Sequence, residues 1–327
     1  MPGPIVRTVL AGVATIVLLL AAGLAMPGWL LFLSTMAISH GVVSLGVVVM
    51  MRAGVVSFGQ GFVFATGGYA AALIANRWGV TDALLLLLGG GFAAVAISLP
   101  FAPLLARYRG IFFAMLTLAI SMVLYGVLLK SAALGGSDGF NVGRPSVFGV
   151  VLDEQANLGL YVIAVVVVGL LTIATRVYGD SVRGLASLAI RENELRVEYL
   201  GASVRGAIAA NYLIAAFLGG VGGALTLLAL GHIDPAFSYW TTSGEFVFVA
   251  ILAGHHSVLA VFVASFIVEL VRSFSNLYFP NTWQLAMGVF LLVVIRFLPR
   301  GLGSLWADRR RVAPAAAEPA AMKEASR

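Results

Sequence analysis

Side chains that could carry catalysis are scarce in this sequence. No P-loop occurs, and lysine is present only at Lys130 and Lys323, so the chain cannot bind ATP through a Walker A loop. No H-E-x-x-H motif is found. Cysteine is absent, which excludes disulfides, thiolate metal sites and cysteine nucleophiles. We therefore predict that the protein is not an enzyme and uses no cofactor.

The sequence contains one pair of adjacent histidines, a candidate for metal binding. His255 and His256 are adjacent in the sequence, so their side chains would diverge on a helix and make a poor pair of metal ligands. We interpret them as part of a solvated turn and predict no bound metal.

Polar residues in or beside long apolar stretches are the better functional candidates: Ser57, Gln60, Thr117, Asn211 and Glu245. Another acid, Glu269, has Arg272 three residues further on, and we predict a local ion pair near the outer face. Glu245 has no sequence-local partner. It is either an interfacial acid satisfied by the backbone or another helix, or an ionisable residue on a pathway.

A charged segment, residues 176–205, interrupts the apolar sequence. The apolar runs on its two sides, 158–175 and 207–230, are each close to the roughly 20 residues that span hydrocarbon, so the charges must lie in water at one membrane face. Leucines are interleaved with the charges, as in a short amphipathic helix with a face to bury: Leu185, Leu188, Leu195 and Leu200. The pattern favours a docking element, and a plain surface loop is the alternative.

Composition requires a membrane environment. The 327 residues are 61% hydrophobic and 10% charged, with a mean hydropathy of +1.02, whereas a soluble domain carries about 25% charged residues. We predict an all-α, polytopic transmembrane bundle. The excess of 20 Lys and Arg over 14 Asp and Glu is explained by basic cytoplasmic loops rather than by nucleic-acid binding.

Ten apolar runs are predicted to cross the membrane as helices: 8–26, 29–51, 58–75, 83–105, 110–129, 158–175, 207–230, 238–253, 257–274 and 283–298. The first is interpreted as a retained span, and the eighth is short. Ten crossings place all but four of the 20 Lys and Arg residues on the side of the charged segment, the exceptions being Arg77, Lys130, Arg144 and Arg272. By the positive-inside rule this side, with both termini, is cytoplasmic.

The predicted domain organisation is simple. Residues 1–306 form a transmembrane domain that includes a cytoplasmic loop at 176–206, and residues 307–327 form a disordered cytoplasmic tail. The longest outer segment, 131–157, is rich in glycine and is predicted to be a structured external loop.

Glycines cluster inside the predicted spans. Gly219 and Gly223 form a G-x-x-x-G pattern, which is typical of helices whose backbones approach closely in a membrane. A second cluster, within 57–68, allows another interpretation, a broken helix that lines a pathway.

Five motifs, in order, resemble a known family. The sequence AIRENELRVEYLGASV at 189–204 is similar to the cytoplasmic loop of ABC-transporter permeases for branched-chain amino acids, specifically the second, M-type subunit. The other four motifs are SFGQG (57–61), RYRGIFFAMLTLA (107–119), GGSDG (135–139) and PRGL (299–302). Residues 253–257 read AGHHS where the family usually has a glycine-rich turn.

The resemblance implies a subunit of a bacterial inner-membrane importer. Its partners would be a homologous permease, two cytoplasmic ATPase subunits, a periplasmic binding protein and membrane lipid, with no nucleic acid. The substrate would be a branched-chain or related amino acid; the alternatives are urea, short amides or another small polar solute, or an ion-coupled secondary transporter. Missing buried acids argue against the ion-coupled alternative.

Two sets of residues follow from this implied function. An amino-acid zwitterion needs polar but weakly binding groups along its route, and the five polar residues named above are the candidates. The predicted coupling site for the ATPase subunits comprises Leu188, Arg191, Glu192, Asn193, Glu194, Leu195, Arg196, Glu198 and Gly201.

Overall fold

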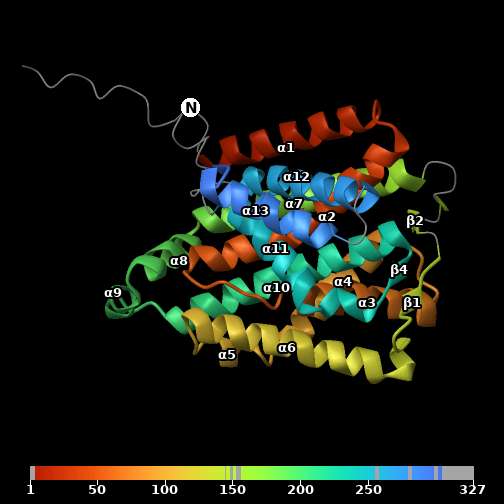
Figure 1. The fold of residues 1–327 in the computed structure, drawn as a ribbon. Helices are drawn as coiled ribbons and strands as arrows, with labels where there is room; N and C mark the ends of the chain where they lie inside the picture. The colour runs from red at the N-terminus through yellow and green to blue at the C-terminus, as the bar shows by residue number, and fades with distance from the viewer. Residues whose placement is uncertain are drawn as a thin grey trace, which may run out of the picture.

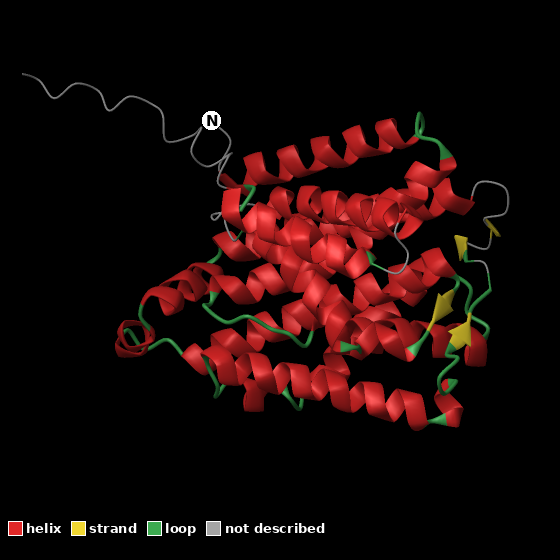
Figure 2. Cartoon of the chain, viewed as in Figure 1, coloured by secondary structure: helices red, strands yellow, loops and turns green. Residues whose placement is uncertain are grey.

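The computed structural model describes residues 4–143, 145–147, 150–151, 156–254, 258–278, 282–297 and 301–303. In this part the chain is a bundle of α-helices with small strands at one end (Figures 1 and 2). The helices are α1 (Pro4–Gly23), α2 (Gly28–Arg52), α3 (Gln60–Trp78), α4 (Ala83–Ser98), α5 (Ala102–Leu105), α6 (Gly110–Lys130), α7 (Ala156–Asp180), α8 (Val182–Glu192), α9 (Glu194–Tyr199), α10 (Val204–Leu230), α11 (Trp240–Ala253), α12 (Val258–Tyr278) and α13 (Trp283–Phe297). The prediction of an all-α bundle is confirmed.

Short elements connect these helices. Two 3-10 helices, η1 (Ala132–Leu134) and η2 (Pro235–Ser238), precede or follow the strands β1 (Phe140–Asn141), β2 (Ser146–Val147), β3 (Val150–Val151) and β4 (His232–Ile233). β1 pairs with β4 and β2 pairs with β3, both antiparallel. Two sequence predictions, for the pair His255–His256 and for the tail 307–327, concern residues outside the described part of the chain.

Each predicted span corresponds to a helix. In the described part of the chain, six helices are long and apolar enough to cross a membrane, namely α1, α2, α6, α7, α10 and α12. The other runs form α3, α4, α11 and α13, which have 19, 16, 14 and 15 residues. The fourth run is not continuous as predicted: α4 ends at Ser98 and α5 begins at Ala102. Pro100 lies between them, and proline has no N–H to continue a helix.

Helix α10 is central and packs on α2, α3 and α4. Glycines of α10 let its backbone approach the neighbouring helices closely, because a glycine places no side chain between them. Gly219 faces Val63 of α3, and Gly223 lies against the carbonyl oxygen of Phe64. Gly222 contacts Val43 of α2. Between helices in lipid the attraction is van der Waals contact rather than hydrophobic burial, so close approach is what stabilises this core.

Several helices begin or end at the end of the bundle that carries α8 and α9 (Figure 1). Arg52, the last residue of α2, donates from Nη2 to the carbonyl oxygen of Gly179 near the end of α7, at 2.9 Å. At the end of α11, the Leu302 N–H donates to the carbonyl oxygen of Leu252 at 2.8 Å. The start of α1 lies at this same end of the bundle, and the strands lie at the other (Figure 1). For these helices the directions agree with the prediction, and the number of ten crossings stays a prediction.

Candidate functional site

Helix α3 begins inside the bundle, after a buried non-helical segment. Residues 55–59 form no regular structure, although Val55 and Ser57 are each only 1% exposed. Irregular backbone at membrane depth is tolerated where protein covers it, since lipid offers no hydrogen bonds. The predicted interruption near residue 57 therefore exists, and it precedes α3 rather than dividing it.

Hydroxyl groups satisfy the backbone at this helix start. The N–H of Phe58 donates to Thr117 Oγ1 of α6 at 3.2 Å, and the N–H of Gly59 donates to Ser57 Oγ at 3.2 Å. The N–H of Gly61 donates to Ser243 Oγ of α11 at 2.9 Å. The structure thus brings the predicted residues Ser57 and Thr117 together at one point, beside the first residue of α3, Gln60.

Two further hydroxyls at this point were missed by the sequence analysis. Ser243 supplies the bond to Gly61, and Ser121 of α6 donates to the carbonyl oxygen of Ser238 in η2 at 2.8 Å. Both serines are fully buried. Serine is common on apolar helices, so only their position, and not a sequence signal, sets them apart. Below, the start-of-α3 cluster means Ser57, Gln60, Thr117, Ser121 and Ser243.

Gln60 differs from its neighbours in this cluster. The residue is 2% exposed, and among the described residues its Oε1 atom has no hydrogen-bond donor. The oxygen faces α10, where a methyl group added to Gly219 would stand 3.4 Å away. A buried acceptor without a donor is unfavourable and calls for a physical reason.

The predicted candidate Asn211 lies away from the start-of-α3 cluster, in a different hydrogen-bond network. Its Nδ2 donates to Ser187 Oγ of α8 at 2.9 Å, and its Oδ1 accepts from the hydroxyl of Tyr178 of α7 at 2.6 Å. Asn211 is fully buried. Its amide therefore ties α7, α8 and α10 together beneath the charged segment.

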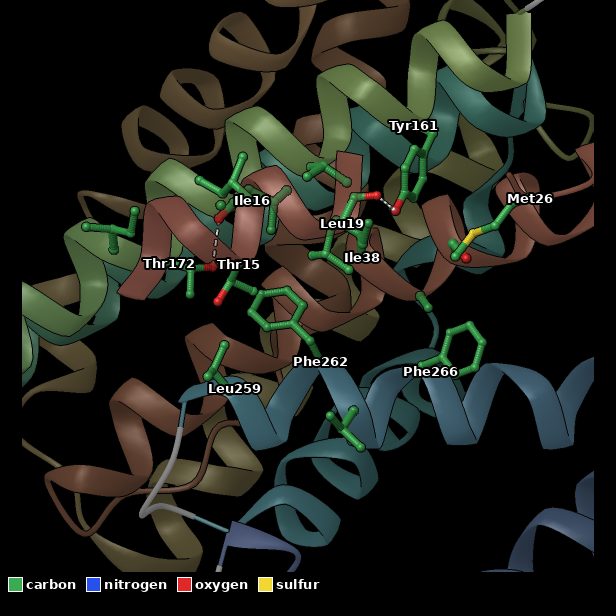
Figure 3. Close-up of a pocket in the computed structure, with 18 residues that line it drawn as sticks. Thr15, Ile16, Leu19, Met26, Ile38, Tyr161, Thr172, Leu259, Phe262 and Phe266 are labelled. Carbon is green, nitrogen blue, oxygen red and sulfur yellow. Dashed lines mark hydrogen bonds between the residues drawn. The ribbon is translucent and has the colours of Figure 1, made fainter. Parts of the chain in front are cut away.

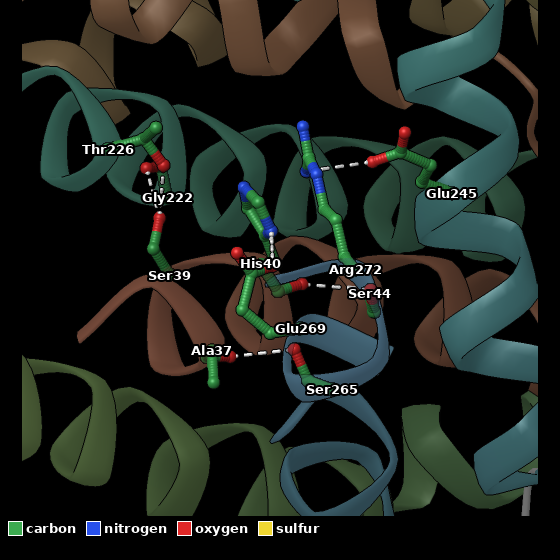
Figure 4. A network of polar contacts seen from close by, with 10 residues as sticks. All are labelled: Ala37, Ser39, His40, Ser44, Gly222, Thr226, Glu245, Ser265, Glu269 and Arg272. Atoms are coloured by element: carbon green, nitrogen blue, oxygen red, sulfur yellow. Dashed lines mark hydrogen bonds and ion pairs between the residues drawn. The ribbon is translucent and has the colours of Figure 1, made fainter. Parts of the chain in front are cut away.

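Glu245 has a partner on another helix. Its Oε2 accepts from Arg272 Nη1 of α12 at 3.0 Å, with the side chains 19% and 34% exposed (Figure 4). Its neighbour Ser243 belongs to the start-of-α3 cluster, whereas the Glu245 side chain points toward α12. Of the two interpretations left open by the sequence, the first one, an acid satisfied by another helix, describes this contact.

A second ion-pairing contact lies next to it (Figure 4). Nδ1 of His40, in α2, is 3.0 Å from Oε2 of Glu269, in α12, and the two side chains are 12% and 13% exposed. The imidazole also meets the rings of Phe64 and Phe246 edge-on. The sequence prediction had assigned Glu269 only a local partner, Arg272, and had not considered His40.

This pair has two consequences for the sequence analysis. In the sequence, the signal for this pair was His40 itself, a lone histidine in the middle of an apolar run. The statement that buried acids are missing was also wrong, because Glu269 lies among α2 and α12 with a polar partner. The content of buried acids therefore does not distinguish this chain from an ion-coupled carrier.

The charged segment forms two helices rather than the one that was predicted. α8 ends at Glu192 and α9 begins at Glu194. Asn193 between them is extended (φ −161°, ψ 106°), and its Oδ1 accepts from the N–H of Arg196 at 3.1 Å. Asparagine is a favourable N-cap, so this residue both ends one helix and starts the next.

Buried apolar residues hold these two helices on the bundle. Ile190 and Val197 are 2% and 5% exposed and pack with Met50 and Ile208 of α2 and α10. Arg109, before α6, donates from Nε to Glu194 Oε1 at 2.7 Å. The predicted coupling residues Arg191, Glu192 and Glu198, by contrast, are exposed.

Large apolar side chains are exposed on α9 and at Leu200, the residue that follows it. Leu195, Tyr199 and Leu200 are 63%, 88% and 86% exposed, whereas Leu188 is half-buried. Apolar side chains gathered at one end of a membrane bundle suit a protein partner. The predicted docking face is therefore available on the structure, and contact with a partner remains a prediction.

Comparison with known proteins decides the family. The model of the family described as "Branched-chain amino acid transport system / permease component" matches residues 29–296. The chain belongs to this permease family. It is 26% identical over 298 residues to the high-affinity branched-chain amino acid transport system permease protein LivM of Escherichia coli K12, covering 83% of this chain and 69% of the relative. The LivM protein of Salmonella typhimurium LT2 is 25% identical over the same shares. No solved structure matches significantly.

Family membership and the apolar helices together make this permease a multi-pass inner-membrane protein. The outer surface of the bundle therefore faces the hydrocarbon of the membrane. Within the described residues, no three His, Asp or Glu side chains converge as ligands for a metal ion. The buried polar side chains described above are hydroxyls and amides, together with the two ion-pairing contacts.

A cavity of the permease lies apart from these polar groups (Figure 3). It has a volume of about 450 Å³ and lies between α1, α2, α7 and α12. Its threonine hydroxyls, on Thr15 and Thr172, bond to carbonyl oxygens of their own helices. Aliphatic and aromatic side chains form nearly all of the remaining lining, including Ile38, Phe262 and Phe266. Such a lining suits hydrocarbon and offers nothing to a charged solute.

Proposed function

We propose that this chain is the membrane-spanning permease subunit of an ABC importer that moves branched-chain amino acids into the cell. The observation that carries the proposal is the start-of-α3 cluster in a chain of this family. The irregular segment 55–59 leads into the middle of the bundle and ends among neutral hydroxyls and one amide. Neutral polar groups bind a zwitterion weakly enough to release it.

The route that we propose passes the start-of-α3 cluster. Among the five residues predicted from the sequence, Ser57, Gln60 and Thr117 are assigned to the route. Asn211 and Glu245 are proposed to act indirectly, since each holds two or more helices in place through its side chain. Their loss would alter the shape of the route and not its chemistry.

The energy for import must come from outside this chain, which has no P-loop. We propose that two ATPase subunits dock on α8 and α9. The exposed apolar side chains Leu195, Tyr199 and Leu200 would be the anchors, and the charges around them, such as Arg191 and Glu192, would fix the register. A homologous permease and a periplasmic binding protein complete the proposed importer, as the permease relatives' names imply a larger transport system.

A second candidate substrate class is small uncharged polar solutes such as urea or short amides. The neutral lining of the start-of-α3 cluster favours them as well, because hydroxyls and an amide can bond to an amide solute. The ion-coupled alternative is not proposed, since the family is that of a transport-system permease component.

Reconstitution of the whole importer tests the proposal. Proteoliposomes would hold this permease, its partner permease and both ATPase subunits, with the binding protein and labelled leucine outside. We expect uptake of leucine that requires ATP inside the vesicles, and no competition by excess urea. The control is a preparation in which the ATPase subunits cannot hydrolyse ATP. Absence of leucine uptake, or uptake of urea instead, would contradict the proposed function.

A further inference from the structure

The amide oxygen of Gln60 is in an unusual position for a membrane protein. Gln60 is 2% exposed, and no donor among the described residues reaches its Oε1 atom. Native proteins leave few buried acceptors without a donor, and each such group calls for an explanation, such as a bound water or a role at a functional site. An acceptor oxygen calls for a donor, such as an ammonium group.

The direction of this oxygen is set by α10. Gln60 Oε1 lies beside Gly219, where the absence of a side chain leaves bare backbone, and Val63 occupies the space next to it. The oxygen therefore points into the contact between α3 and α10 and away from lipid. A ligand would reach it when these two helices separate at this point.

Donors for an anion lie within one turn of the same helix. The N–H groups of Phe58, Gly59 and Gly61 bond only to hydroxyl oxygens, and Gly59 at the N-cap provides no side-chain cap. A helix N-terminus carries a partial positive charge, and anions bind there readily. In transporters, helices that start near the membrane midplane direct this end toward anionic groups of the substrate.

We propose that the start of α3 is the subsite for the charged head of an α-amino acid. Gln60 Oε1 accepts a hydrogen bond from the substrate ammonium group. The carboxylate accepts hydrogen bonds from the N–H groups at the start of α3 and from the hydroxyl of Ser57. The Thr117 hydroxyl donates to the carbonyl oxygen of Ala114 at 2.9 Å, so Thr117 positions the N–H of Phe58. This inference rests on the proposed function and adds to it the groups that recognise the zwitterion.

The test compares Gln60→Met with Gln60→Glu in the reconstituted importer. Methionine has a similar length, but its thioether sulfur is only a weak acceptor. Leucine uptake should therefore fall about tenfold or more, as for the loss of one hydrogen bond to a charged group. ATP hydrolysis stimulated by the loaded binding protein should persist, because binding-protein docking does not involve Gln60. Glutamate keeps an acceptor oxygen and should retain most of the uptake.

A matched control lies on the same helix. Thr66 is 6% exposed, and its hydroxyl donates to the carbonyl oxygen of Phe62 within α3. Thr66→Val removes a buried polar group that already has a partner, and uptake should remain at the wild-type level. A loss of uptake equal to that of Gln60→Met would assign the effect to α3 packing and overturn the subsite.

Thermal stability separates the subsite from a structural role. Removal of an acceptor without a partner should leave the melting temperature of the Gln60→Met complex unchanged or raise it. A clear decrease would mean that the oxygen holds the protein together, directly or through water, and would overturn the proposal. Wild-type uptake by Gln60→Met would do the same. Failure of the wild-type importer to take up leucine would instead refute the proposed function itself.

Discussion

At the scale of single residues, the glycines of α10 decide how the bundle packs. Gly223 lies against the carbonyl oxygen of Phe64, and Gly220 lies against Gly67, so two backbones touch without side chains between them. Gly12 of α1 differs, because its neighbour is the side chain of Ile173, which can move aside. A backbone atom cannot move without moving its whole helix.

A substitution of Gly223 by leucine should therefore be poorly tolerated. We expect Gly223→Leu to destabilise the folded permease by about 1–3 kcal/mol or more through overpacking against α3. Gly126 of α6 is the control, since no atom lies within 4 Å of a methyl group added there; Gly126→Leu should change stability by less than about 0.5 kcal/mol. The measurement is the melting temperature in detergent. Equal melting temperatures for the two variants would refute a packing role for Gly223.

The contact between Glu245 and Arg272 also leads to a prediction for the stability of single variants. Either Glu245→Gln or Arg272→Gln should lower stability by about 1–3 kcal/mol, as expected for a hydrogen bond to a charged group. The exchanged pair, Glu245→Arg with Arg272→Glu, should recover part of this loss because the attraction is restored. Melting temperatures of the wild type, the two single variants and the exchanged pair show whether the attraction between the two charges accounts for the loss. Unchanged stability with reduced leucine uptake would instead place Glu245 on the substrate route.

Single residues show how much of the candidate site the sequence predicts. Ser57, Gln60 and Thr117 stood out as polar groups in apolar surroundings, and the structure brings them to one helix start. Asn211 gave the same signal, but its amide bonds to Ser187 and Tyr178 and makes no hydrogen bond to the residues at that helix start. Polarity in a span predicts that a partner exists but not which partner, because the partner comes from another helix.

At the scale of elements, α8 and α9 combine a buried and an exposed apolar surface. Ile190 and Val197 are buried against the bundle, and Leu195, Tyr199 and Leu200 are exposed. The interleaved leucines predicted an amphipathic element, and the charges predicted its position at a membrane face. The break at Asn193 was not predicted, because a capping asparagine has the same appearance as a polar surface residue until its backbone is known.

This division of surfaces predicts different effects for two neighbouring residues. Leu195→Ala should leave permease stability unchanged, because Leu195 is 63% exposed, but weaken binding of the ATPase subunits by about 2 kcal/mol, or roughly thirtyfold. Glu192→Arg should likewise reduce coupling through a reversed rim charge. Val197→Ala is the matched variant: Val197 is 5% exposed and should lower stability instead. The measurements are co-purification with the ATPase subunits and melting temperature.

Two results would contradict this view of α8 and α9. Wild-type co-purification and wild-type substrate-stimulated ATP hydrolysis in both Leu195→Ala and Glu192→Arg would mean that the segment is an exposed loop without a partner. A decrease in melting temperature for Leu195→Ala equal to that for Val197→Ala would mean that Leu195 contributes to the fold and not to docking.

At the scale of the whole molecule, the order of apolar runs determined the fold to a large extent. Each predicted span became a helix, since a backbone in hydrocarbon must satisfy its own hydrogen bonds. The paired strands β1 and β4 were not predicted, because their partners are 91 to 93 residues apart in numbering, as the pairs Asn141–His232 and Phe140–Ile233 show. Contacts between distant segments are not encoded in the local hydrophobic pattern.

The orientation of the whole bundle is the last prediction. Asp138 and Glu198 are both exposed, one in the loop before β1 and the other in α9, at opposite ends of the bundle. Because the chain has no cysteine, Asp138→Cys and Glu198→Cys each introduce a single reactive thiol. In intact cells with a permeable outer membrane, an impermeant maleimide should label position 138 at once and position 198 only after the inner membrane is opened. The reverse pattern would place α8 and α9 outside, where no ATPase could reach them, and labelling of both positions from outside would show that the number of crossings between residues 138 and 198 is even.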